Sequence, residues 1–172
     1  MSPVEVRPAT LRDAKAIATL HVKVWQEAYV GLLPDEHLQS LSVDKRHTLW
    51  RDAIEYSEPQ VQVAVVDGEI VGFVGFDRSR DPKSKPTVGE IWAMYVTPAF
   101  WGKGVGLALW DAAREGLDEE GCSNVTLWVL LHNERALRFY ELAGFKRELN
   151  TAKTVERGGV KVEEIRLKRG LD

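Results

Sequence analysis

The glycine-rich turn Trp101-Gly102-Lys103-Gly104-Val105-Gly106 is the stretch of this sequence best suited to chemistry. It follows an apolar segment that stops at Pro98 and leads directly into a helical pattern. Glycine permits positive φ and lets the backbone approach a ligand. The first amides of a helix have no internal partner and lie at its positive end. The turn therefore predicts an anion site suited to phosphate or pyrophosphate, where Lys103 adds one positive charge.

Two common phosphate-binding patterns fit this turn badly. A Rossmann fingerprint needs a third glycine where Leu107 stands, and a P-loop needs Ser or Thr after Gly-Lys, where Gly104 stands. A glycine-rich turn that only joins a strand to a helix is the plain structural alternative, and the turn alone leaves it open.

Asn133 and Tyr140 form a second pair with chemical potential. They are seven positions apart, so on a helix they share a face and lie roughly 10 Å apart along the axis. Each also has an ordinary structural role. Asn133 is a good N-cap, and Tyr140 beside Phe139 suits a core position with a hydrogen-bonded hydroxyl.

The cysteine and the histidines give weaker indications of a functional role. Cys122 follows Gly121 between a helical and an apolar segment, which favours a small buried residue over a nucleophile. The four histidines lack metal-ligand spacing, so we expect no metal site.

Composition narrows the class of protein. The chain has 172 residues, one cysteine and a net charge of −3. That charge argues against a nucleic-acid partner, which normally meets a basic face. A single cysteine excludes an internal disulfide and suits a reducing compartment, and no apolar run is long enough to cross a bilayer. We therefore expect a cytoplasmic protein with no membrane partner and a weak attraction for cationic amines.

The elements that must position these residues follow from periodicity. Asp67-Gly68 is the strongest hairpin signal, Thr10 to Asp13 resembles a capping box, and Asp77 to Pro86 is expected to be a mobile surface loop. A break in alternation between Glu163 and Glu164 predicts a bulge. No linker or repeat divides the chain, so residues 1–172 are expected to form one α/β domain. Strands are predicted at 4–7, 60–66, 69–76, 90–96, 124–131 and on both sides of 157–159, and helices at 14–29, 35–54 with a break at 40–44, 104–119 and 133–142.

Two segments together resemble the signatures of the GNAT superfamily of N-acetyltransferases. The first runs from Ile91-Trp92-Ala93-Met94-Tyr95-Val96 through the glycine turn to Leu109. The second joins Leu127-Trp128-Val129 to Asn133, Ala136, Phe139-Tyr140-Glu141 and Gly144-Phe145. The order of elements also matches over nearly the whole chain. One position departs from the pattern, because Trp101 stands where the family usually has Arg or Gln. Three roles are open for this tryptophan: it shields the pyrophosphate, it touches the adenosine moiety, or it only packs at the surface.

The resemblance implies a fold and a cofactor site. The fold would be a mixed, mostly antiparallel sheet of about seven strands with helices on both faces and a splayed parallel strand pair. Acetyl-coenzyme A would bind as cosubstrate, without a metal, with pantetheine between strands 90–96 and 124–131. The site residues implied are the backbone of Met94, Tyr95 and Val96, the turn residues Trp101, Gly102, Lys103, Gly104, Val105 and Gly106, and the side chains of Asn133 and Tyr140.

The implied reaction is direct acetyl transfer to a primary amine of a small molecule or peptide. Tyr140 would protonate the departing thiolate, since the ordinary pKa values of phenol and thiol differ by about 1.5 units. Glu90 would be the base, or else a plain strand-end carboxylate. In this superfamily the region of Trp25 and Tyr29 borders the acceptor site, and a homodimer is compatible with the family.

A non-catalytic acyl-coenzyme A-binding module is the alternative function. A pure binder needs neither Tyr140 nor Glu90, so their presence favours the enzyme. A nucleotide-binding protein is a more distant third, because it would need a Ser or Thr where Gly104 stands.

Overall fold

The protein is built on a seven-stranded sheet with the strand order β1-β2-β3-β4-β5-β7-β6. The computed structural model describes residues 2–157 and 159–171. The strands are β1 (Glu5–Pro8), β2 (Gln60–Val66), β3 (Glu69–Arg78), β4 (Val88–Val96), β5 (Asn124–Leu130), β6 (Lys146–Arg157) and β7 (Val160–Gly170). The helices are α1 (Ala14–Ala28), α2 (Asp35–Gln39), α3 (Val43–Tyr56), α4 (Val105–Glu119) and α5 (Glu134–Leu142), with short 3₁₀ turns at Leu11–Asp13 and Pro98–Phe100.

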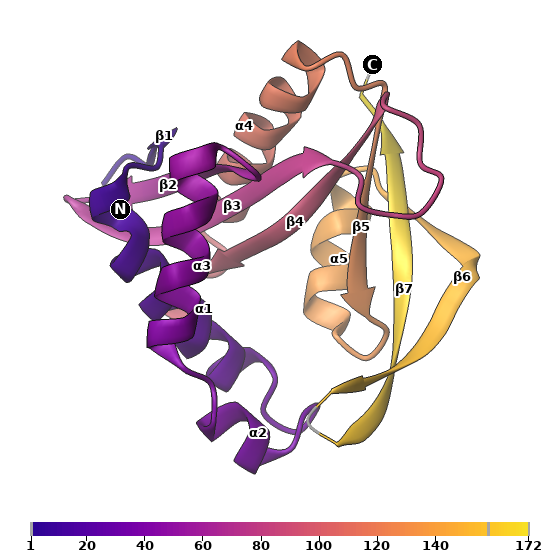
Figure 1. Cartoon of the computed structure of the whole chain (residues 1–172), viewed down its shortest axis with the longest axis horizontal. Helices are drawn as coiled ribbons and strands as arrows, with labels where there is room; N and C mark the ends of the chain where they lie inside the picture. The colour runs from indigo at the N-terminus through magenta and orange to yellow at the C-terminus, as the bar shows by residue number, and fades with distance from the viewer. Residues whose placement is uncertain (1, 158, 172) are drawn as a thin grey trace.

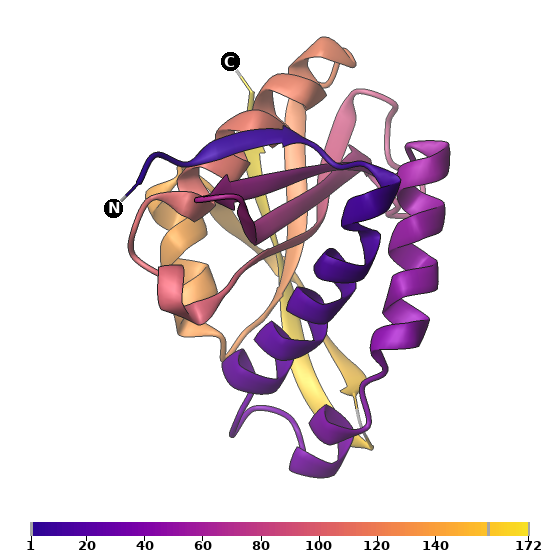
Figure 2. The ribbon, with the colours of Figure 1, turned by 90° about the vertical axis from the view of Figure 1, so that its left-hand side faces the viewer.

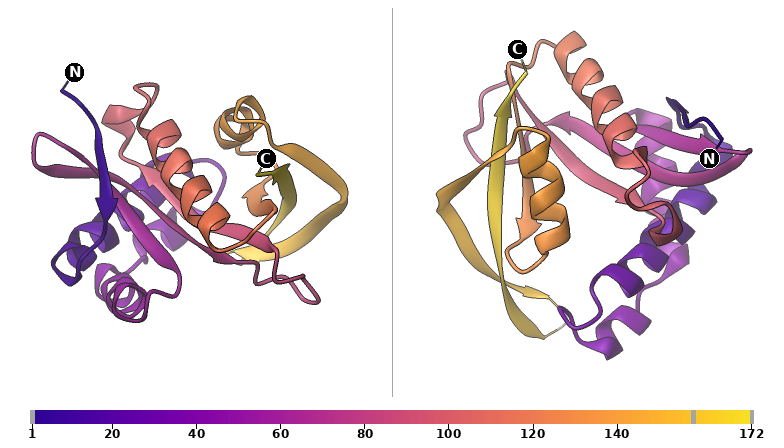
Figure 3. Two further views of the ribbon diagram at one scale, coloured as in Figure 1. Left: turned by 90° about the horizontal axis from the view of Figure 1, so that it is seen from above. Right: turned by 180° about the vertical axis from the view of Figure 1, so that it is seen from behind.

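Neighbouring strands of this sheet are antiparallel except for the parallel pair β4–β5. In Figure 1, β4 and β5 begin close together and diverge, so the sheet opens into a V. Helices α1 and α3 cover one face, and α4 and α5 cover the other (Figures 2 and 3). The predicted fold, a mixed and mostly antiparallel sheet with helices on both faces and a splayed parallel pair, is confirmed.

Two apolar clusters fill the two sides of the sheet. On one side α4 packs on the sheet through fully buried residues such as Leu109 and Leu117, with Phe76 facing them from β3. On the other side Trp50 of α3 packs against Phe73 of β3 with ring centroids 5.1 Å apart. The periodic apolar residues of the helices therefore bury their stripes as the sequence predicts.

Local signals formed as predicted. Asp67 and Gly68 have φ values of 51° and 79°, the positive angles of a type I′ hairpin turn. The Thr10 backbone N–H donates to the Asp13 carboxylate at 2.7 Å, which completes the capping box. Asp13 also accepts from Arg7 at 2.8 Å, so the same carboxylate fixes the start of α1 against β1.

The predicted bulge between Glu163 and Glu164 is wrong. The pairing of β6 with β7 stays in register there, and it shifts instead between Glu148 and Lys153 on β6. The alternation breaks for another reason. Val162 packs with the cluster of Tyr29 and Leu33, whereas Ile165 and Leu167 face the main core. The strand therefore changes its buried face along its length without an extra residue. The centre of the predicted tail turn, Gly158, lies outside the described residues.

The loop after β3 is tied to the sheet at several points. Its Arg80 forms an ion pair with Glu90 at 2.7 Å, and its Asp81 accepts hydrogen bonds from Trp128 and Arg166. These bonds hold the predicted surface loop against β4, β5 and β7. Among the described residues, no helix has the length and apolar character needed to cross a bilayer.

Candidate active site

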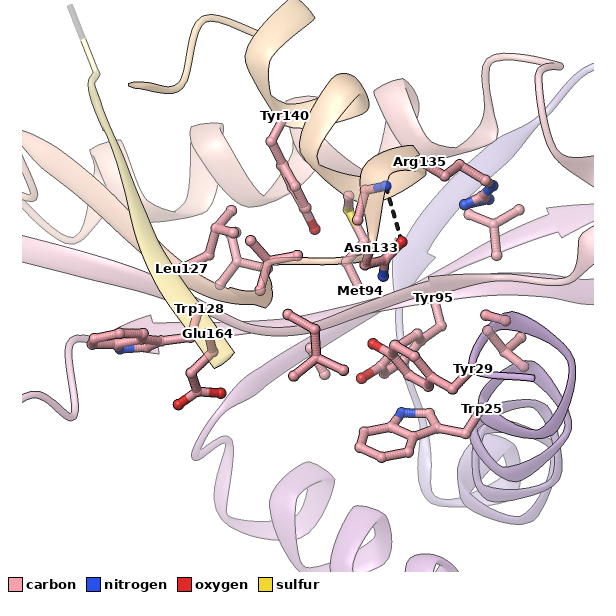
Figure 4. Close-up of a pocket in the computed structure, with 18 of the residues that line it drawn as sticks. Trp25, Tyr29, Met94, Tyr95, Leu127, Trp128, Asn133, Arg135, Tyr140 and Glu164 are labelled. Carbon is pink, nitrogen blue, oxygen red and sulfur yellow. Dashed lines mark hydrogen bonds between the residues drawn. The ribbon is translucent and has the colours of Figure 1, made fainter. Parts of the chain in front are cut away.

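A cleft opens where β4 and β5 separate. Their parallel pairing covers only Val88 to Glu90 opposite Asn124 to Thr126. Beyond that point β4 still pairs with β3, and β5 still pairs with β7. The edges of β4 and β5 that face each other are no longer paired. The cleft has a volume of about 410 Å³ and is lined from β4, β5, β7, α1 and α5. Figure 4 shows its walls and the side chains that project into it.

The glycine turn borders a second hollow that adjoins the cleft. This hollow has a volume of about 290 Å³. The residues that line both spaces are Met94, Val96, Trp101, Arg135, Ala136 and Tyr140. The two spaces therefore form one path from the glycine turn to the gap between β4 and β5.

The turn presents a row of free amides to this hollow. Gly102 and Gly104 have φ values of 72° and 83°, and a Cβ on either would meet nothing within 4 Å. In the part of the chain that the structure describes, no hydrogen bond engages the backbone N–H groups of residues 102–107; the first helical bond runs from Ala108 N–H to the Gly104 carbonyl. The amides lie at the positive end of α4, the arrangement that binds anions.

The remaining turn residues have distinct surroundings. Val105 is fully buried in the main core, so its backbone is what it can offer a ligand. A Cβ at Gly106 would come within 3.1 Å of the Phe139 ring, so this glycine also lets α4 approach α5. The Lys103 ammonium lies 5.5 Å from the Phe100 ring centroid and is exposed.

Trp101 is held in place on both sides. Its indole Nε1 donates to the Val96 carbonyl at 2.7 Å, and the Arg135 guanidinium carbon lies 3.4 Å from the ring centroid. The residue lines both spaces and is a structural link between the end of β4, the turn and α5. The predictions that it shields pyrophosphate or touches adenosine stay untested.

The edge of β4 offers alternate backbone groups to the cleft. The Thr97 N–H donates to the Val71 carbonyl, so the polar groups of Thr97 and Tyr95 face β3. Those of Met94 and Val96 consequently face the gap, where the Val96 carbonyl is already engaged by Trp101. Tyr95 therefore reaches the cleft with its side chain rather than with its backbone, unlike Met94 and Val96.

Tyr140 projects from α5 into the cleft (Figure 4). The residue is 8% exposed, and its hydroxyl has no hydrogen-bond partner within the described residues. Burial, followed by the nearby Tyr29, raises the pKa of Tyr140 above its ordinary value, whereas Arg135 lowers it. The phenol is thus protonated at physiological pH and available as a donor.

Asn133 caps α5 as its sequence position suggests. Its Oδ1 accepts from the Ala136 N–H at 3.3 Å (Figure 4). With the oxygen used by the cap, the amide NH₂ is left to face the cleft, of which Asn133 forms part of the lining.

Glu90 lies outside the set of residues that line the cleft, which is unfavourable for its predicted role as base. The residue is 2% exposed, and its carboxylate accepts from the backbone N–H of Arg80 at 2.8 Å and from the guanidinium at 2.7 Å. Because β4 starts at Val88, Glu90 falls inside the sheet where β4 and β5 still pair. This geometry indicates an anchor for the loop after β3.

Glu164 is a cleft carboxylate that sequence reasoning missed. It lines the cleft from β7, near Trp128 of β5 (Figure 4). Its oxygens lie 3.7 Å from Lys153 and from Arg157. The alternation of the strand places Glu164 on the same face as Val162, which could have indicated its position. The bulge predicted between Glu163 and Glu164 assigned Glu164 to the wrong face.

Trp25 of α1 and Tyr29, the residue directly after α1, were predicted near an acceptor site, and both line the cleft. Cys122 is buried within the main core, and its thiol pKa is raised by that burial. A Cβ on the neighbouring Gly89 would lie 3.3 Å from its sulfur, which fits the predicted small core residue.

A splayed parallel strand pair, a glycine turn of free amides and a phenol in the gap together define the architecture of an acyltransferase of the N-acetyltransferase type. The model of the acetyltransferase (GNAT) family matches residues 17–145. The chain therefore belongs to the GNAT family of acetyltransferases and is an acyltransferase.

Relatives and solved structures agree with this placement. The chain is 30% identical to an uncharacterized N-acetyltransferase of Bacillus subtilis, YuaI, over 95% of this chain and 91% of the relative. It is 35% identical to an uncharacterized N-acetyltransferase of Archaeoglobus fulgidus over 73% of this chain and 84% of the relative. The fold is similar to that of yncA, a putative acetyltransferase of Salmonella typhimurium solved with acetyl-CoA (TM-score 0.74, 20% identity, 99% and 95% of the two chains). It is also similar to the paia N-acetyltransferase of Thermoplasma acidophilum in complex with coenzyme A (TM-score 0.71, 18% identity, 98% and 99%).

Proposed function

We propose that the protein transfers an acetyl group from acetyl-coenzyme A directly to a primary amine of a small molecule or peptide. One observation carries the proposal: free amides at the start of α4 and the open edge of β4 border one continuous path, and Tyr140 lines both of its parts. The structures of yncA and of the paia N-acetyltransferase, solved with acetyl-CoA and coenzyme A, support the same cosubstrate.

The residues present fit that cosubstrate. The unengaged amides of residues 102–106 suit a pyrophosphate, because Gly102 and Gly104 leave their side of the backbone open. The cleft-facing backbone groups of Met94 and Val96 suit an amide-bearing chain such as pantetheine. When bound, acetyl-coenzyme A supplies an acetyl group activated as a thioester.

The chain's own groups would then handle charge and protons. The Val96 N–H, fixed by the strand, can stabilise negative charge that develops on a carbonyl oxygen, an effect typically worth about 3 kcal/mol in a transition state. The Tyr140 hydroxyl donates a hydrogen bond toward the leaving sulfur. Because burial raises the pKa of Tyr140, stabilising the thiolate by hydrogen bonding is easier for this phenol than giving up its proton completely.

The acceptor amine must be neutral before it attacks. Glu164 is the half-buried carboxylate on the cleft wall, and we assign it the role of receiving the amine's proton, directly or through water. Glu90, by contrast, is fully engaged with Arg80.

Two measurements test the proposal. Acetyl-coenzyme A should raise the melting temperature in proportion to its binding, by mass action on the native state. A panel of primary amines, assayed for acetyl-coenzyme A-dependent thiol release, should contain at least one acceptor. Binding without any acetyl transfer across the panel would support the non-catalytic module instead, and absence of both would remove the proposal.

A further inference from the structure

The cleft contains a buried donor that lacks a well-formed hydrogen bond. Among the described residues, the indole Nε1 of Trp25 is the buried side-chain polar atom without a partner at hydrogen-bond geometry, and its nearby acceptor is the Tyr95 hydroxyl, on which it acts only as a weak donor. Trp25 lines the cleft from α1, and leaving such a donor unpaired is unfavourable in a folded protein. A missing partner beside a cleft points to an atom that a ligand brings.

The neighbours of this indole are also donors. Tyr29 and Tyr95 extend their hydroxyls beside the Trp25 ring, with Asn133 above them (Figure 4). Tyr29 interacts with both Asn133 and Tyr95 through hydrogen bonding. Asn133 uses its oxygen to cap α5, so it faces Tyr29 with its NH₂ group.

Counting donors and acceptors shows what is lacking. Trp25 Nε1 and the Asn133 NH₂ can only donate, and each phenol adds one more donor. The donor wall, as we name Trp25, Tyr29, Tyr95 and Asn133, thus offers five hydrogens (one indole, two amide and two phenol) against three oxygens, of which Asn133 Oδ1 already accepts from the Ala136 N–H.

Two arginines near the donor wall favour a negative ligand, and the Glu27 carboxylate that also lines the cleft is exposed to solvent. Arg46 acts electrostatically on Tyr95, and Arg135 acts on Tyr29. Neither guanidinium forms an ion pair within residues 2–157 and 159–171. On the opposite wall, the charge of Glu164 is offset by Lys153 and Arg157. A carboxylate is the common organic group that combines negative charge with several lone pairs.

We propose that the donor wall binds a carboxylate of the acceptor, so that the substrate class is an amine that carries a carboxylate, such as an amino acid. The inference rests on the proposed function, because it assigns the acceptor end of the same cleft. It separates this class from simple alkylamines and from polyamines, which carry no anion for the wall to hold.

Matched acceptors test the class directly. Each common amino acid should be compared with the amine made by removing its carboxylate and with its carboxamide, using thiol release at saturating acetyl-coenzyme A. The expected result is a kcat/KM for the best amino acid at least about tenfold above that of its decarboxylated partner, as for loss of a hydrogen-bonded charged group. Equal or better turnover of the decarboxylated amines would overturn the inference while leaving amine acetylation intact. Preference for carboxamides or short peptides would overturn the carboxylate in favour of a neutral carbonyl.

Variants test the wall itself. Trp25→Phe and Tyr95→Phe should raise KM for the preferred amino acid about tenfold or more, with kcat and KM for acetyl-coenzyme A little changed. Trp110→Phe, which removes an indole from the core on the other side of the sheet, is the matched control. If Trp25→Phe folds poorly, Tyr95→Phe decides the outcome. An unchanged KM for the amino acid in the folded variants would refute the donor wall as its binding site.

Discussion

The indole nitrogen of Trp101 donates a hydrogen bond of 2.7 Å to the carbonyl oxygen of Val96. This bond joins the last residue of β4 to the first residue of the glycine turn. It fixes the edge of the cleft relative to the row of free amides. A tryptophan at this position thus has a definite structural task in this chain.

We expect Trp101→Phe to weaken acetyl-coenzyme A binding about fivefold, because one hydrogen bond contributes about 1 kcal/mol net. Isothermal titration of the variant against acetyl-coenzyme A measures the effect. Trp110→Phe should bind as wild type does. A Trp101→Phe protein with unaltered affinity would show that the bond to Val96 does not organise the turn.

Gly104 and Gly121 provide a matched pair for the anion site. Both have φ of 83° and open space where a Cβ would go, but they stand at opposite ends of α4. Alanine at either should lower the free energy of unfolding by about 1 kcal/mol through backbone strain. Acetyl-coenzyme A should then stabilise Gly121→Ala as it does wild type and fail to stabilise Gly104→Ala in thermal melts. Equal ligand stabilisation of the two variants would contradict the site at the turn.

Tyr140→Phe should lower kcat about 10²-fold, as loss of one hydrogen-bond donor to developing negative charge does, with little change in the Kd of acetyl-coenzyme A. Because burial raises the pKa of Tyr140 above 10, the phenol keeps its proton up to that pH. The rate profile of the wild type should therefore show no alkaline decline from this group below pH 10. Wild-type turnover by Tyr140→Phe would exclude it from the reaction.

Glu90→Gln and Glu164→Gln separate anchoring from catalysis. Glu90→Gln should lower the free energy of unfolding by about 1–2 kcal/mol, since Arg80 loses a buried charged acceptor but is itself half exposed. Its kcat should stay close to that of wild type. Glu164→Gln should leave the free energy of unfolding close to that of wild type and reduce kcat/KM about tenfold. Loss of activity in Glu90→Gln, with normal activity in Glu164→Gln, would restore Glu90 as the base.

His21 should make the fold sensitive to acid. Burial, together with Arg46, lowers the pKa of His21 to about 3 from an ordinary 6.5. Below pH 6.5 the unfolded chain therefore binds a proton at His21 that the folded protein does not bind. The free energy of unfolding falls by up to about 1.4 kcal/mol for each pH unit between 6.5 and the pKa of the folded state. His21→Asn can still accept from the Trp50 Nε1, which His21 binds at 3.0 Å. The free energy of unfolding, measured with urea at several pH values between 4 and 7, should fall less steeply with decreasing pH for this variant than for wild type. The same pH dependence in both proteins would contradict the assignment.

Much of the fold could be predicted from the sequence because its signals were local. The Asp67-Gly68 turn, the Thr10–Asp13 capping box and the glycines of the turn each specify a backbone conformation without distant contacts. The separation of β4 from β5 was implied by the family resemblance. Strand periodicity by itself indicated burial and no cleft.

The features that the sequence did not reveal depend on partners distant in sequence. Glu90 was proposed as a base because it stands alone among apolar residues, but its role is set by Arg80 in a loop that shows no pattern. The face of Glu164 was hidden because Val162 and Ile165 bury opposite sides of one strand against different clusters. The bond from Trp101 to Val96 required the turn to be folded before it could be seen.

The register shift of β6 has a consequence for where this chain can tolerate a change in length. Between the pairs Glu148–Arg166 and Lys153–Glu164, β6 carries extra residues, and Thr151 fills the break by accepting from the Arg166 N–H at 3.0 Å. Residues can therefore be inserted or deleted in this unpaired segment of β6 without disturbing the pairing of β7 with β5. Such changes would reshape the hairpin that carries Lys153 and Arg157 while leaving the glycine turn as it is. Under the proposed function, the Glu164 end of the cleft can therefore change while the glycine turn keeps its geometry.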